Sequence, residues 1–216
     1  MVVTPRLSGL LLAPGASAGR EQPALVAIDE AVSALGLVVD RIDFPYHLAG
    51  RRRPDPPAVL IETVAAAARS LAARSLAARS PAARTPAARA GKVAAVEAST
   101  ASLVLGGRSM GGRICSMAVA EGLAAAGLVL VSYPLHPPGR PDKLRTDHFP
   151  RLNVPCLFVS GSRDPFASRS ELQGATRAIV GPVTHVWVDG DHALKRRDAK
   201  VASHVAAWML ALMECS

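Results

Sequence analysis

Short runs of apolar residues alternate with segments of helical periodicity along most of this 216-residue chain. Several of the runs are apolar at every position, which is typical of strands that are buried on both faces of a parallel sheet. Neighbouring parallel strands need long crossover connections, which are usually helices. The alternation therefore predicts an α/β fold with one mostly parallel sheet covered by helices on both faces, in a single domain over residues 1–216.

The expected elements follow directly from this pattern. Strands are predicted at residues 7–13, 37–44, 103–105, 128–133, 156–160 and 184–188. Helices are predicted at residues 25–35, 57–79, 112–123, 168–179 and 201–212. The loop at 134–154 is too short for a large cap domain, so we expect a compact fold with a shallow pocket.

A five-residue repeat rich in alanine and arginine occupies residues 70–89, within an Ala/Arg/Pro-rich insert at 65–91. The whole chain carries a formal charge of +8, and the insert adds arginines without any acid. In a continuous helix each repeat would rotate by about 140°, so the arginines would scatter around the axis. Pro81 and Pro86 should end the regular helix near Arg79. The insert is therefore interpreted as a surface linker, and nucleic-acid binding through it is the weaker alternative.

The three cysteines and the lengths of the apolar runs indicate the cellular compartment of the protein. Cys115, Cys156 and Cys215 are odd in number and lack the spacing of a disulfide framework or metal site, so we expect reduced thiols, the first two in the core. No apolar run reaches the roughly 18 residues of a membrane span. Residues 6–18 imitate a secretory signal, but they are better interpreted as a strand and a functional turn. These features favour a cytoplasmic protein without metal or cofactor.

The sequence Gly107-Arg108-Ser109-Met110-Gly111 has the form G-x-S-x-G, directly after a buried strand and before a helix. In this context the motif predicts a nucleophile elbow, a sharp turn that exposes the serine hydroxyl at the edge of the sheet. The glycines are needed because the turn brings the flanking backbone too close for side chains. Ser109 is therefore the candidate nucleophile.

A serine hydroxyl needs a base that removes its proton and an acid that orients this base. Asp164 follows the strand at 156–160, and His192 follows the strand at 184–188. The order Ser, Asp, His is that of α/β-hydrolases, with each residue just past the carboxyl end of a strand. Two alternatives stay open: Asp164 as a plain turn residue before a proline, and Asp191 as the acid.

A negatively charged oxygen in the reaction would need hydrogen-bond donors. The backbone amides of Met110, after the nucleophile, and Ala16, in the turn after the first strand, are the candidate oxyanion donors. His185 and His204 lie within a strand and a helix and are interpreted as structural. His136 and His148 flank the loop at 134–154, where they would line the pocket or lie on the surface.

Four segments together carry a resemblance to a known family: Leu11-Leu12-Ala13-Pro14-Gly15-Ala16, Gly107-Arg108-Ser109-Met110-Gly111-Gly112-Arg113, Ser132-Tyr133-Pro134-Leu135-His136-Pro137-Pro138-Gly139 and Gly161-Ser162-Arg163-Asp164-Pro165-Phe166. They resemble the small dienelactone-hydrolase-related α/β-hydrolases, a family that also includes a chromatin-associated subunit of a histone acetyltransferase complex. The resemblance implies a catalytic triad of Ser109, Asp164 and His192.

The sequence departs from that family at two positions. Pro14 stands where relatives usually have histidine, and Ser109 stands where dienelactone hydrolases proper use cysteine. The second departure argues against a dienelactone substrate. We therefore expect a serine esterase that cleaves small esters with short acyl chains, with Tyr133 and His136 as candidate substrate-binding residues. The alternative is a non-catalytic hydrolase-like interaction module, and nothing in the sequence predicts an oligomeric state.

Overall fold

Six parallel strands form one sheet in the computed structural model, which describes residues 7–16, 18–79 and 100–214. The strands are β1 (Gly9–Ala13), β2 (Val38–Arg41), β3 (Leu103–Arg108), β4 (Gly127–Val131), β5 (Cys156–Gly161) and β6 (Val183–Val188). Their order across the sheet is β2-β1-β3-β4-β5-β6, and every neighbouring pair is parallel. The predicted fold class is confirmed.

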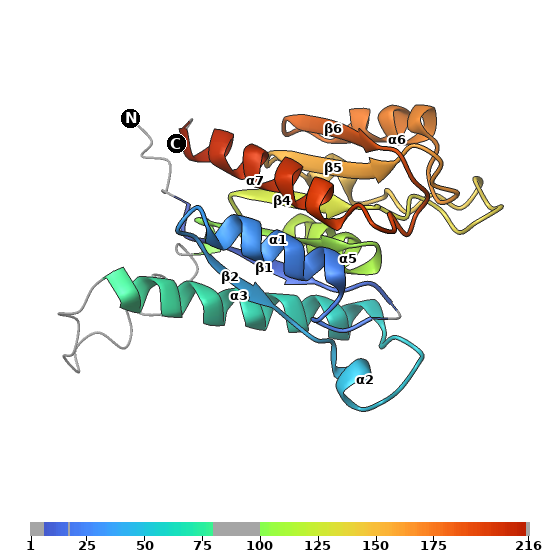
Figure 1. Cartoon of the computed structure of the whole chain (residues 1–216). Helices are drawn as coiled ribbons and strands as arrows, with labels where there is room; N and C mark the ends of the chain where they lie inside the picture. The colour runs from blue at the N-terminus through green and yellow to red at the C-terminus, as the bar shows by residue number, and fades with distance from the viewer. Residues whose placement is uncertain (1–6, 17, 80–99, 215–216) are drawn as a thin grey trace.

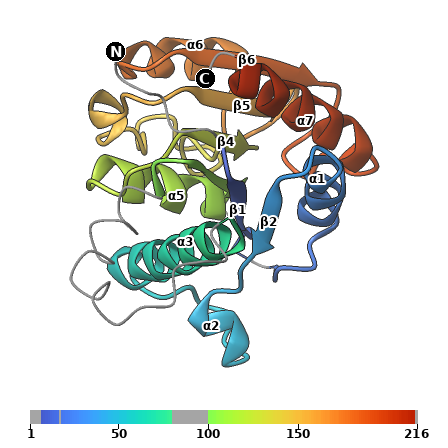
Figure 2. The same cartoon turned by 90° about the vertical axis from the view of Figure 1, so that its left-hand side faces the viewer.

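Helices cover both faces of this sheet (Figure 1). They are α1 (Pro23–Ser33), α2 (Pro45–Leu48), α3 (Pro57–Arg79), α5 (Met110–Ala120), α6 (Arg169–Ala175) and α7 (Asp198–Glu214), with short 3-10 turns at Phe149–Arg151 and Thr176–Ala178. Figure 2 shows α1 and α7 on one side of the sheet and α3 and α5 on the other.

Each face of the sheet has its own apolar core, which explains why the strands are apolar at consecutive positions. Leu10 and Leu12 of β1 are fully buried in the layer under α1 and α7. Leu11, between them, is fully buried in the other layer, under α3 and α5. Because side chains alternate between the two faces of a strand, only a continuous apolar run can fill both layers.

The structure corrects several predicted boundaries. The strand predicted at 37–44 ends at Arg41, where the charged side chain pairs with Asp29 at 2.9 Å along the edge of the sheet. The chain then forms the four-residue helix α2, which the sequence pattern did not predict. The helix predicted from residue 112 begins earlier, at Met110, and the one predicted at 168–179 ends at Ala175 and continues as a 3-10 turn.

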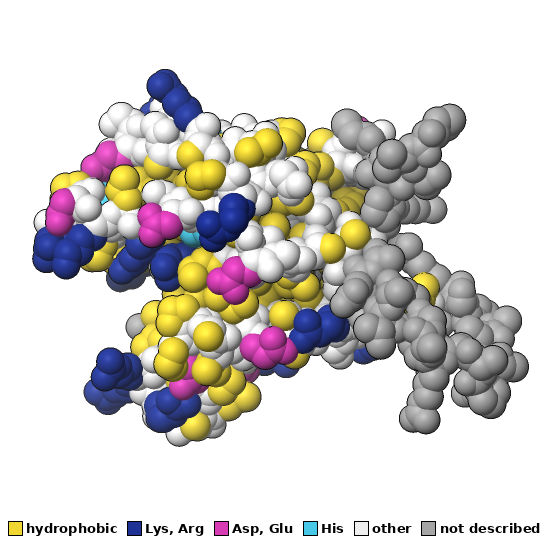
Figure 3. Space-filling model, turned by 180° about the vertical axis from the view of Figure 1, so that it is seen from behind, with side chains coloured by type: hydrophobic (Ala, Val, Ile, Leu, Met, Phe, Trp, Pro, Cys, Tyr) yellow, Lys and Arg dark blue, Asp and Glu magenta, His cyan; other side chains and the backbone are white. Residues whose placement is uncertain are grey.

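The insert lies only partly within the described residues. Helix α3 is described as far as Arg79, and the copies of the repeat from residue 80 to 89 lie outside the described ranges, so the predicted helix end near Arg79 stays a prediction. Arg69 pairs with Glu62 at 2.7 Å, and Arg74 pairs with Asp40 of β2. On the face drawn in Figure 3, Lys and Arg side chains occur in small groups among hydrophobic and acidic ones. Arg69 and Arg74, the two arginines of the insert whose side chains are described, thus make separate ion pairs with different partners.

Cys115 and Cys156 are buried free thiols, as predicted, and burial raises the pKa of each to about 12. Both therefore stay protonated near neutral pH and act as small core residues. Cys215 lies outside the described residues. Among the helices of the described ranges, none is long and apolar enough to cross a membrane.

Candidate active site

Ser109 occupies a sharp turn between β3 and α5. Its backbone has φ 51°, a left-handed conformation that side chains rarely adopt. A Cβ atom on Gly107 or Gly111 would collide with the carbonyl oxygen of Ala13 in the neighbouring strand, so both positions need glycine. Strand β1 packs directly against this turn, and the close packing holds Ser109 in its strained conformation, as expected for a nucleophile elbow.

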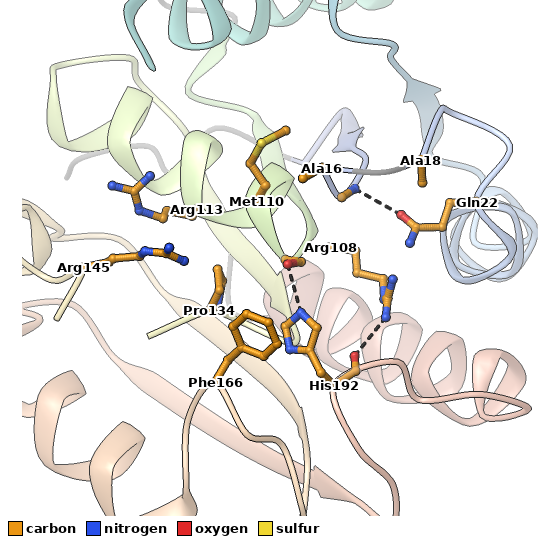
Figure 4. Close-up of a pocket in the computed structure, with 12 residues that line it drawn as sticks. Ala16, Ala18, Gln22, Arg108, Met110, Arg113, Pro134, Arg145, Phe166 and His192 are labelled. Carbon is orange, nitrogen blue, oxygen red and sulfur yellow. Dashed lines mark hydrogen bonds between the residues drawn. The ribbon is translucent and has the colours of Figure 1, made fainter. Parts of the chain in front are cut away.

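The structure brings Ser109, His192 and Asp164 together, although they are far apart in sequence. His192 Nε2 lies 3.0 Å from Ser109 Oγ, and its Nδ1 lies 2.8 Å from Asp164 Oδ2. Figure 4 shows the contact between the serine oxygen and the imidazole at the centre of the pocket. The three side chains form one continuous chain of hydrogen bonds from a buried carboxylate to an accessible hydroxyl.

Asp164 is held in place by the turn that follows β5. Its side chain is 1% exposed, and its Oδ1 accepts a hydrogen bond of 2.8 Å from the backbone N–H of Phe166. Asp191, the rival acid, instead accepts hydrogen bonds from the amides of Ala193 and Leu194 in its own turn. The geometry therefore selects Asp164, and not Asp191, as the carboxylate that orients the imidazole.

Two further residues fix the loop that carries His192. The Phe166 ring lies against the imidazole, with 4.0 Å between the ring centroids. The Arg108 guanidinium donates a hydrogen bond of 2.8 Å to the carbonyl oxygen of His192. Arg108 is partly buried, and this burial lowers its pKa, an effect that the carboxylates of Asp198 and Asp164 oppose. The elbow and the histidine loop are thus tied together by a charge-assisted hydrogen bond.

The turn after β1 forms the other wall of the site. Because β1 lies between β2 and β3, the chain reverses its winding direction here, and parallel sheets bind ligands at such points. The Tyr46 hydroxyl donates a hydrogen bond of 2.7 Å to the Ala16 carbonyl, and Gln22 Oε1 accepts one of 3.2 Å from the Gly15 amide. Among the described residues, the amides of Ala16 and Met110 have no acceptor. Both are therefore available to a ligand.

A pocket of about 680 Å³ opens above Ser109. This volume lies in the range of small-molecule sites. Its lining residues are Gly15, Ala16, Ala18, Gln22, Arg108, Ser109, Met110, Arg113, Pro134, Arg145, Phe166 and His192. Three of them are arginines and none is acidic, so the wall of the pocket carries positive charge. Among the described residues, no cluster of His, Cys, Asp and Glu has the arrangement needed to hold a metal ion.

Comparison with known families matches residues 7–216 to a model described as an alpha/beta hydrolase domain. The chain belongs to the α/β-hydrolase family. The match covers the whole sheet and every residue of the candidate site.

Solved structures with the same fold are distant in sequence. A dienelactone hydrolase from Anabaena variabilis has a TM-score of 0.66 at 17% identity and covers 95% of this chain and 87% of its own. An alpha-beta serine hydrolase homologue from Coxiella burnetii has a TM-score of 0.67 at 17% identity, with coverage of 93% and 84%. Est1E from Butyrivibrio proteoclasticus, with bound ferulic acid, has a TM-score of 0.67 at 15% identity, with coverage of 97% and 91%.

Two candidate substrate-binding residues of this α/β-hydrolase do not line the pocket, contrary to the prediction. Tyr133 is 1% exposed, and its hydroxyl donates a hydrogen bond of 2.8 Å to the Arg145 carbonyl. His136 is 5% exposed, and its Nδ1 lies 2.8 Å from the Pro137 carbonyl oxygen. The Tyr133 ring is buried against Phe149 and Phe158. Neither Tyr133 nor His136 is among the residues that line the pocket.

Two further histidines take structural places, and His148 neither lines the pocket nor lies on the surface, contrary to the prediction. His148 is buried and shares a hydrogen bond of 2.8 Å with the Ser116 hydroxyl. Burial is the main cause that lowers its pKa to about 4, so the ring is neutral at pH 7. His185 of β6 shares a hydrogen bond of 3.0 Å with Thr176 and stacks beside Phe158, as its position in a strand predicted.

Sequence reasoning missed Tyr46, Arg108, Arg113 and Arg145 as residues of the site. Arg108 and Arg113 flank the elbow, and this adjacency was the available signal. Tyr46 and Arg145 come from an unpredicted short helix and from an irregular loop. No periodic pattern indicates which of their side chains reach the site.

Proposed function

We propose that this α/β-hydrolase is a serine hydrolase that cleaves small carboxylic esters, or related thioesters or lactones, through an acyl-enzyme on Ser109. The observation that carries the proposal is the hydrogen-bonded chain from Asp164 through His192 to Ser109, with contacts of 2.8 and 3.0 Å. Such a chain is what a serine hydroxyl needs to become a nucleophile.

In the first half of the reaction, Ser109 Oγ attacks the substrate carbonyl carbon while its proton passes to His192 Nε2. The carbonyl oxygen becomes an oxyanion, and the free amides of Met110 and Ala16 donate hydrogen bonds to it. The intermediate collapses when the carbon–oxygen bond to the alcohol breaks and His192 returns the proton to that alcohol. Ser109 is then acylated, and the alcohol leaves.

In the second half, His192 Nε2 takes a proton from a water molecule that attacks the acyl carbonyl. The bond to Ser109 breaks, its oxygen recovers the proton from His192, and the carboxylic acid leaves. Asp164 stabilises the imidazolium in both halves by accepting the hydrogen bond from Nδ1. The ester and one water molecule are the only reactants in this scheme, and Ser109 and His192 end in their starting protonation states.

The loop between β4 and β5 supports a preference for small substrates. It contains only a 3-10 turn at Phe149–Arg151 and no inserted domain above Ser109. A pocket of about 680 Å³ with an open mouth buries short groups better than long chains. We therefore expect p-nitrophenyl acetate and butyrate to be hydrolysed faster than esters of long fatty acids.

Covalent labelling tests the proposal independently of the choice of ester. A fluorophosphonate probe should add once to the wild-type protein, and peptide mapping should find it on Ser109. Protein with Ser109→Ala should stay unlabelled under the same conditions. A folded wild-type protein that neither reacts with the probe nor hydrolyses either p-nitrophenyl ester would contradict the proposed function.

Tyr46→Phe tests whether the turn at Ala16 takes part in the reaction. The change keeps the ring but removes the hydrogen bond of 2.7 Å to the Ala16 carbonyl, so the turn should become less well ordered. Loss of one such bond corresponds to about a fivefold decrease in kcat. Steady-state kinetics with p-nitrophenyl acetate measures this decrease. A kcat equal to that of the wild type would show that the Tyr46 hydrogen bond does not contribute to the reaction.

A further inference from the structure

Two of the arginines that line the pocket, Arg113 and Arg145, lie together at one end of it. Arg113 belongs to α5, one turn after Ser109, and Arg145 belongs to the loop between β4 and β5. Figure 4 shows both side chains on the same side of the His192 ring, with Gln22 at the opposite end of the pocket. Two segments from different parts of the chain thus bring positive charge to one place beside the nucleophile.

Neither guanidinium has a partner among the described residues. Arg41, Arg69, Arg140 and Arg163 each pair with a carboxylate, whereas the ion pairs of the described residues include neither Arg113 nor Arg145. The Nε atom of Arg113 is buried and has no hydrogen-bond acceptor. The third arginine of the pocket, Arg108, differs from them because its guanidinium already donates to the His192 carbonyl.

The electrostatics around the pair are unfavourable without a negative charge. Burial lowers the pKa of Arg145, and the nearby charge of Arg113 lowers it further. His148, which feels the charge of Arg113, is itself neutral, and the lining of the pocket contains no acid. Both arginines are partly buried; an unpaired charge that loses part of its hydration costs free energy, and two like charges side by side add repulsion. An anion placed between the two guanidinium groups would remove both costs.

We propose that Arg113 and Arg145 bind an anionic oxygen group of the substrate, so that the natural substrate is a small ester bearing a carboxylate or phosphate. This inference rests on the proposed serine hydrolase function and specifies its substrate class. Guanidinium groups suit this role because their planar N–H donors match the oxygens of carboxylates and phosphates in pairs. The oxyanion donors Met110 and Ala16 stay free for the ester carbonyl.

Matched esters measure the preference for charge. One pair is the mono-p-nitrophenyl ester of glutaric acid and its methyl-capped neutral analogue, with the charge on the acyl side. The other pair is 4-acetoxybenzoate and its methyl ester, with the charge on the alcohol side. Wild-type protein should prefer the charged member of at least one pair by tenfold or more in kcat/KM.

Substitution then assigns that preference to the two arginines. Arg145→Gln and Arg113→Gln should each lower the charged-to-neutral ratio of kcat/KM by about tenfold to a hundredfold, the range for a hydrogen bond to a charged group. Arg140→Gln is the matched control, since Arg140 lies in the same loop but pairs with Asp142 at 3.3 Å on the surface. An equal rate for both members of both pairs, or a preference that survives both substitutions, would overturn the proposal.

A binding experiment separates this proposal from the proposed function. Calorimetry with folded Ser109→Ala protein, which needs no turnover, measures the affinity for glutarate and for inorganic phosphate. At least one of them should bind, and adding Arg145→Gln should weaken that binding tenfold or more; the tighter ligand shows whether carboxylate or phosphate is preferred. If neither binds, the anion site is wrong even where neutral esters are hydrolysed. If binding depends on Arg145 but no ester is hydrolysed, only the proposed function fails.

Discussion

Ser109→Ala is expected to lower kcat for p-nitrophenyl acetate by about 10⁶-fold, the loss seen when a serine nucleophile of this type is removed. The side chain that bonds to the substrate is gone, and no other hydroxyl of the described chain is hydrogen-bonded to His192. The amides of Met110 and Ala16 would still polarise a bound ester, so hydrolysis about 10³- to 10⁴-fold above the rate in water should persist. Initial rates at saturating substrate measure the effect.

Ser162→Ala is the matched control for this substitution. Ser162 is exposed in the loop that leads to Asp164, and its structural hydrogen bond runs from the backbone N–H to the Val188 carbonyl. Removing its hydroxyl should leave kcat within about twofold of the wild type. A Ser109→Ala protein that keeps more than a small percentage of wild-type turnover would show that another group performs the reaction.

Asp164→Asn is expected to lower kcat by about 10⁴-fold while leaving the fold intact. The asparagine keeps the shape of the side chain, but one of the two carboxylate oxygens is replaced by an NH2 group, which cannot accept a hydrogen bond from His192 Nδ1. The imidazole then loses the partner that fixes its tautomer, and the imidazolium formed during the reaction loses its counter-charge. The 1% exposure of Asp164 makes this charge effective because water does not screen it.

Asp191→Asn serves as the control because Asp191 is the rival acid next to His192. Its Oδ1 accepts from the amides of Ala193 and Leu194, an acceptor role that an asparagine oxygen can keep. We expect kcat within a few-fold of the wild type, measured with the same ester. If Asp191→Asn lost activity and Asp164→Asn kept it, the two carboxylates would have to exchange roles.

The sheet and the order of the candidate triad could be predicted because both leave a periodic or positional mark in the sequence. Leu10, Leu11 and Leu12 fill two apolar layers, and this continuous run predicts a central strand. Ser109, Asp164 and His192 each follow a strand, and parallel strands bring their carboxyl ends to one edge. The glycines at 107 and 111 were also predictable, because a sharp turn leaves no room for side chains. In the structure, β1 lies close enough to the elbow to exclude a Cβ atom at both positions.

The walls of the pocket could not be predicted because irregular segments form them. Tyr46 reaches Ala16 from a four-residue helix that has no periodicity, and Arg145 enters from a loop whose path depends on tertiary packing. Tyr133 was expected to contact substrate, but its large apolar ring is buried against Phe149 and Phe158. Cytoplasmic location, the chromatin-associated relationship and the alternative of nucleic-acid binding through the repeat remain predictions from the sequence.

Formation of an acyl-enzyme on Ser109 is the central claim, and rapid mixing with p-nitrophenyl acetate tests it most directly. We expect a burst of p-nitrophenolate that approaches one equivalent per protein, because p-nitrophenolate leaves readily and the acyl-enzyme then accumulates before the slower deacylation. Protein quenched during turnover should carry one acetyl group, mapped to the peptide that contains Ser109. An ester that is hydrolysed while every quenched sample stays unacetylated, and while Ser109→Ala gives the same rate, would contradict the account.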